Sequence, residues 1–86
     1  MNRADFDRNA DELLAALGPE GLRAEADKAG DEYVLLLGGG VAGGPARKTR
    51  DVAEHGLPAG ERLLPGEEGK LDRYRALRRK TDALEP

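Results

Sequence analysis

Hydrophobic residues near the N-terminus follow the spacing of one helix face. They occupy positions i, i+4, i+7, i+8 and i+11, and acidic residues lie near the helix start, where a helix dipole favours anions. The residues of this stripe are Phe6, Ala10, Leu13, Leu14 and Leu17. Gly18 and Pro19 end the pattern. The spacing therefore predicts one helix up to Leu17 and a second, short helix from Pro19 to Gly30.

An unbroken apolar run, residues 33–37, follows this second helix. Five apolar residues between turn signals predict a strand that is covered on both faces. Residues 38–44 are mostly glycine and predict a flexible connector. Pro45 suits the first position of a helix, so a third helix is expected over residues 46–55.

The C-terminal third predicts a weak strand and a strong helix. Residues 62–64 lie between prolines and predict a short strand at a sheet edge. Residues 65–69 predict a turn, and residues 70–84 a last helix. Its apolar seam consists of Leu71, Tyr74, Leu77 and Leu84. The expected fold is thus α+β: a single small, mostly helical domain over residues 1–86. It has one central short strand, or a two-stranded sheet, between N- and C-terminal amphipathic helices.

Charge is distributed unevenly between the two ends of the chain. Residues 1–32 carry a net charge of −5 and residues 70–86 carry +3, whereas the whole chain of 86 residues carries −3. Opposite charges on the two end helices predict that these helices pack together.

Bulky apolar residues are scarce. Leu, Val and Phe supply 13, 3 and 1 residues, and Ile supplies none. Because ordering the backbone costs roughly 1–2 kcal/mol per residue, this core leaves little surplus, and we expect support from a partner or from self-association. The lack of cysteine favours a reducing compartment, so we expect a cytoplasmic protein, or a virion-associated one if phage-encoded. No apolar run reaches the length of a membrane span.

One glycine motif resembles a nucleotide-binding turn. Gly38, Gly40 and Gly43 satisfy G-x-G-x-x-G directly after the predicted strand, which resembles the first turn of the Rossmann fold in flavin- and nicotinamide-dependent oxidoreductases. The resemblance implies that a pyrophosphate would rest on the next helix N-terminus. Only 43 residues follow Gly43, too few for the remaining parallel strands. Anion or nucleotide binding at this loop, with Arg47 and Lys48, is therefore kept as a secondary hypothesis, and no cofactor is expected.

Catalytic and metal-binding groups are sparse. The chain has no Ser and no Cys, so the common acyl-transfer nucleophiles are missing. His55 is the single imidazole, which leaves no cluster for zinc. The sequence therefore predicts no enzyme, no catalytic residues and no metal site.

The last helix is basic. Arg75, Arg78 and Arg79 could neutralise phosphates and Tyr74 could stack on a base, which makes nucleic-acid binding the alternative function. We favour a small protein–protein interaction protein instead: an accessory subunit, a phage-type structural or assembly component, or an inhibitor of a larger complex. Its partner is another protein or a second copy of itself. The expected partner-binding residues are Phe6, Leu13, Leu14, Leu17, Tyr74 and Leu77.

Overall fold

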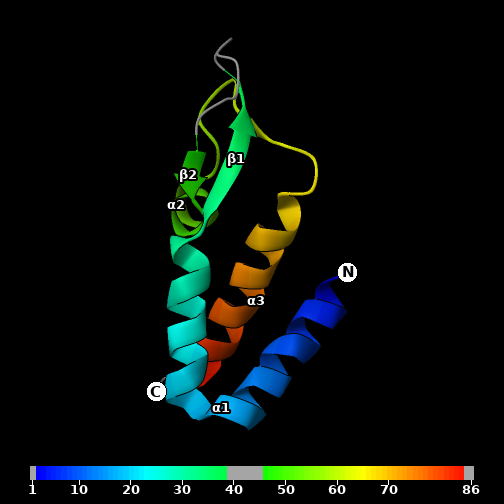
Figure 1. Cartoon of the computed structure of the whole chain (residues 1–86), viewed down its shortest axis with the longest axis vertical. Coiled ribbons are helices and arrows are strands. Elements are labelled where there is room, and N and C mark those ends of the chain that lie inside the picture. The colour runs from blue at the N-terminus through cyan, green and yellow to red at the C-terminus, as the bar shows by residue number, and fades with distance from the viewer. Residues whose placement is uncertain (1, 39–45, 85–86) are drawn as a thin grey trace.

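The computed structural model describes residues 2–38 and 46–84. In chain order these residues form α1 (Arg3–Asp31), β1 (Tyr33–Leu37), β2 (Ala46–Lys48), α2 (Thr49–His55), β3 (Arg62–Leu63) and α3 (Glu68–Leu84). The mostly helical α+β class is confirmed, but the sheet has three strands within the described residues rather than one or two. The molecule extends over 44 × 24 × 16 Å, with the sheet at one end and the bend of α1 at the other (Figure 1). No helix in the described part of the chain is long and apolar enough to cross a membrane.

Helix α1 is bent into two arms. Asn2 caps the first arm: its Oδ1 accepts from the Asp5 N–H at 3.0 Å, and the Asp5 carboxylate accepts from the Asn2 N–H at 3.2 Å. Gly18, at φ 75° and ψ 176°, ends this arm, and Pro19 begins the second because its ring already holds a helical φ. The two predicted helices and their boundary are therefore confirmed. Figure 1 shows the arms on either side of α3.

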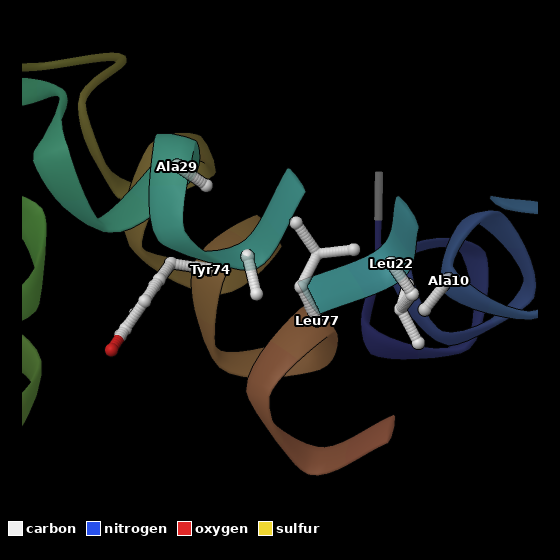
Figure 2. Packing of buried hydrophobic residues seen from close by; sticks show 6 residues of the cluster. Ala10, Leu22, Ala29, Tyr74 and Leu77 are labelled. Atoms are coloured by element: carbon white, nitrogen blue, oxygen red, sulfur yellow. The ribbon is translucent and has the colours of Figure 1, made fainter. Parts of the chain in front are cut away.

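The two arms of α1 and helix α3 share one apolar cluster. Its buried residues are Ala10, Leu22, Ala26, Ala29, Tyr74 and Leu77, which come from both arms of α1 and from α3 (Figure 2). Helix α3 begins at Glu68, two residues before the predicted start. Leu84, expected in the apolar seam, is exposed, whereas Thr81 is buried and donates its hydroxyl proton to the Leu77 carbonyl at 2.7 Å.

Ion pairs join α1 to α3. The Arg79 guanidinium lies 2.7 Å from the Asp7 carboxylate, and the Arg73 guanidinium lies 3.4 Å from the Glu25 carboxylate. Lys80 pairs with Asp11 on the same interface. The prediction that the two end helices pack through complementary charge is confirmed.

The sheet is antiparallel, in the order β2-β1-β3. The predicted edge strand is present as β3. The predicted helix over residues 46–55 is wrong at its start, because Ala46–Lys48 pairs with β1 and the helix begins only at Thr49. Thr49 fixes this boundary, since its N–H and its hydroxyl both donate to the Glu32 carbonyl at 2.8 Å. Pro45 lies outside the described residues.

Helices cover one face of the sheet. Val34 and Leu36 are fully buried and pack with Val52 of α2 and Leu71 of α3. The prediction that β1 is covered on both faces is wrong, because its remaining side chains are exposed. Both helices near the sheet lie on the same side of it, so no described element covers the other side.

Candidate functional site: the outer face of the sheet

Strand β1 presents a column of large apolar side chains to solvent. Tyr33, Leu35 and Leu37 are 56%, 46% and 38% exposed, while the alternate residues are buried. Successive side chains of a strand point to opposite faces, so these three lie on one side of the sheet. An antiparallel sheet with one solvated face normally carries polar residues there. This column therefore departs from the usual pattern.

Strand pairing defines the rest of this surface. Residues directly opposite in an antiparallel pair project to the same face. Lys48 is opposite Tyr33, Ala46 is opposite Leu35, and Arg62 is opposite Leu37. We call the surface of Tyr33, Leu35, Leu37, Ala46, Lys48 and Arg62 the outer face. Among the described residues, the six strand positions of the outer face hold four apolar residues, two cations and no carboxylate.

The backbone edge of β1 beside β3 is closed by side chains. Strand β3 pairs only with the end of β1. Nearer the start of β1, the Glu67 carboxylate accepts from the Leu35 N–H at 2.9 Å, and the Lys70 ammonium donates to the Tyr33 carbonyl at 3.1 Å. The two side chains also pair with each other at 3.2 Å. The Leu35 N–H and the Tyr33 carbonyl are therefore already hydrogen-bonded on this edge.

The electrostatic state of Glu67 follows from this arrangement. The hydrogen bond from the Leu35 N–H stabilises the ionised carboxylate, and it is the main reason that the pKa of Glu67 lies below its ordinary value of 4.5. Burial raises this pKa, whereas Lys70 lowers it further. Glu67 is therefore a charged acceptor at neutral pH.

Arg47, one of the two predicted anion contacts next to the glycine loop, already has a close carboxylate partner. Arg47 forms two hydrogen bonds with Glu61, at 2.8 and 3.0 Å. The pair raises the pKa of the Arg47 guanidinium and lowers the pKa of the Glu61 carboxyl, in each case mainly through this hydrogen bonding. Lys48 lies 3.8 Å from Asp31. Of the glycine loop itself only Gly38 is described, so ligand binding by residues 39–44 lies outside the described residues.

The predicted basic face of α3 is partly neutralised. Arg79 pairs with Asp7, and Arg78 lies 3.5 Å from Asp82. The hydrogen bond from Arg79 lowers the pKa of the Asp7 carboxyl. Arg75 is exposed and has no ion pair among the described residues, whereas Tyr74 is buried and so not placed for stacking on a base.

The predicted partner-binding residues lie in the helical layer, away from the outer face. Tyr74 and Leu77 are buried in the helical cluster (Figure 2). Leu13 and Leu14 are half-buried against this cluster, and Phe6 is also buried. Leu17 alone among the six is exposed, at 49%. Three of them line an open hollow of about 360 Å³ between α1 and α3. Its lining consists of Phe6, Asn9, Glu12, Leu13, Ala16, Arg73 and Leu77.

Sequence reasoning missed the exposed column because the strand is apolar at every position. An alternating pattern would have separated the two faces, and five consecutive apolar residues do not.

The described residues contain no group of three or more His, Asp or Glu side chains that could hold a metal ion. Comparisons of the chain with protein-family models, with curated proteins and with solved structures find no significant match. Function is therefore inferred from the surface geometry.

Proposed function

We propose that the protein is a small, non-enzymatic protein–protein interaction module that binds its partner through the outer face. The observation that carries the proposal is the column of Tyr33, Leu35 and Leu37, which remains exposed although the opposite side of the same strand is fully buried. A contiguous exposed apolar patch is typical of an interaction surface.

The energetics support this choice of surface. Burying apolar area contributes roughly 25 cal/mol per Å², and Tyr is enriched at the centres of interfaces. The strand is also held in place before binding, because β2 and β3 flank it and Glu67 and Lys70 bind its backbone. A pre-ordered surface loses little conformational entropy on association. The proposal includes a cytoplasmic location, or association with a virion if the protein is phage-encoded. It also includes a role as an accessory subunit, a structural or assembly component, or an inhibitor of a larger complex.

The test compares two exposed leucines. Leu35→Asp places a charge on the outer face, and Leu17→Asp places the same charge on an equally exposed site at the bend of α1. Both variants should keep the circular dichroism of the native chain. Tagged full-length protein is then used to capture partners from an extract of the native host, with quantification by mass spectrometry. We expect capture to be lost with Leu35→Asp and kept with Leu17→Asp. Equal capture by both variants would contradict the proposal.

Nucleic-acid binding has weaker support. Two of the three predicted arginines of α3 are paired with aspartates, and the predicted stacking residue, Tyr74, is buried. A salt titration separates this alternative, because phosphate binding weakens steeply with salt whereas apolar association changes little.

A further inference from the structure

The two cations of the outer face lie at opposite corners of the apolar column. Lys48 is opposite Tyr33 at the start of β1, and Arg62 is opposite Leu37 at its end. They belong to different flanking strands, β2 and β3, so one lies on each side of the column. The apolar centre is thus bracketed by positive charge at both ends.

Both cations are available to a partner. The Arg62 side chain is exposed and forms no hydrogen bond or ion pair within residues 2–38 and 46–84. Lys48 is half-exposed, and its nearest acid, Asp31 at 3.8 Å, is bound more closely by Arg50 at 2.9 Å. In a chain with a net charge of −3, this face is locally basic. Charge complementarity therefore favours a partner that carries carboxylates and disfavours a basic one.

The shape of the surface limits the partner further. Both edges of β1 are occupied, one by β2 and the other by β3, Glu67 and Lys70, so a partner strand has no room to pair with β1. Its face is free, and a helix is a usual cover for a bare sheet face. Five strand residues span about 17 Å, which matches a helix of about three turns.

We propose that the outer face binds an amphipathic helix of a partner protein, about three turns long, whose apolar stripe is bracketed by carboxylates. The helix packs on Tyr33, Leu35 and Leu37, and its acidic ends pair with Lys48 and Arg62. The inference rests on the proposed function, since it assigns a partner chemistry to the same surface.

The test uses two synthetic helical peptides that share one leucine stripe. One peptide carries Glu at both ends of this stripe, and the other carries Lys at the same positions. Each is titrated into ¹⁵N-labelled full-length protein, and amide shifts are followed by NMR. We expect the Glu peptide to shift the amides of residues 33–37 and to bind roughly tenfold more tightly than the Lys peptide.

Arginine variants locate the charge preference. Arg62→Glu should remove most of the preference for the Glu peptide. Arg75→Glu is the matched control, because Arg75 is also exposed and without an ion pair among the described residues but lies on α3. This variant should leave the preference unchanged.

Several results would overturn the inference. Two of them are equal affinity for the two peptides and the absence of amide shifts on adding either peptide. A third is that the amide shifts occur at Leu13 and Leu77, in the hollow between α1 and α3. A fourth is that the amides of residues 33–37 shift with protein concentration when no peptide is present. The last result would assign the outer face to a second copy of the chain.

If capture from the host extract still depends on Leu35 in any of these cases, the proposed function stands and only the inference of an acidic partner helix fails. If capture does not depend on Leu35, the proposed function itself fails.

Discussion

At the scale of single residues, Glu67 has a structural role that its neighbour Glu68 lacks. Glu67 accepts from the Leu35 N–H, and this contact lowers its pKa below 4.5. A carboxyl with a lowered pKa in the folded state stabilises the protein above its unfolded-state pKa, and that contribution is lost as the pH falls through the folded-state pKa. Glu68 is exposed at the start of α3.

We predict that Glu67→Gln lowers the free energy of unfolding by about 1 kcal/mol at pH 7, because the negative charge that accepts the hydrogen bond from the Leu35 N–H is removed. The difference from the native chain should be constant above pH 5 or so and should shrink as the pH falls below about 4.5. Urea denaturation across this pH range measures it. Glu68→Gln should change the free energy of unfolding by less than about 0.5 kcal/mol. A difference that persists at low pH would show that charge is not the cause.

Gly18 is the residue that allows α1 to bend. Its φ of 75° and ψ of 176° lie in a region that is essentially restricted to glycine. We predict that Gly18→Ala lowers the free energy of unfolding by about 1–3 kcal/mol. Gly69→Ala is the control, since Gly69 lies within α3 with open space around it, and it should raise stability by about 0.4–1 kcal/mol. Equal effects of the two substitutions, measured by thermal denaturation, would argue against a strained bend.

At the scale of elements, opposite charge aligns α1 with α3. Arg73 of α3 lies 3.4 Å from Glu25 of the second arm, and both side chains are partly exposed. We predict that Arg73→Glu destabilises the fold through repulsion and that adding Glu25→Arg recovers about 0.2–1 kcal/mol. A double-mutant cycle by urea denaturation gives this coupling. The coupling should shrink in about 1 M NaCl, where exposed charges are screened.

The control for this cycle is Arg75→Glu, which removes the same charge from α3 at a position without an ion pair among the described residues. It should change stability little, and Glu25→Arg should not compensate for it. A coupling of the same size with Arg75 would mean that the net charge of α3, rather than the pair, controls helix packing.

At the scale of the whole molecule, two core clusters lie along the long axis. One joins the arms of α1 to Tyr74 and Leu77, and the other joins the sheet to Leu71. Helix α3 contributes to both, and Ala53 of α2 packs against both. The two ends are therefore mechanically connected through α3 and α2.

We predict that the molecule unfolds in one cooperative transition. Leu22→Ala, at a fully buried site of the helical cluster, should lower the free energy of unfolding by about 2–5 kcal/mol. Because the clusters share α3, the sheet should unfold at the same urea concentration as the helices. In a Tyr74→Phe background, whose one remaining tyrosine is Tyr33, tyrosine fluorescence reports on the sheet, and far-ultraviolet circular dichroism reports on the helices. Separate midpoints would show that the ends unfold independently.

The sequence was informative where structure depends on neighbouring residues. The apolar spacing of α1, its break at Gly18 and Pro19, and the edge strand β3 were all predicted from local pattern. The start of α2 was not, because Ala46–Lys48 has no strand pattern of its own and becomes extended by pairing with β1. The closure of the β1 edge by Glu67 and Lys70 was also missed, since it joins residues 32 or more positions apart.

The sequence pattern thus determined that both ends of the chain are helical, where α1 bends, and that the oppositely charged end helices attract each other. Only the tertiary structure decided which side of β1 is buried. A uniformly apolar strand carries no information on its orientation, and the covered side is set by where the connected helices α2 and α3 pack. The same packing leaves Tyr33, Leu35 and Leu37 exposed, and with them the surface proposed to bind a partner.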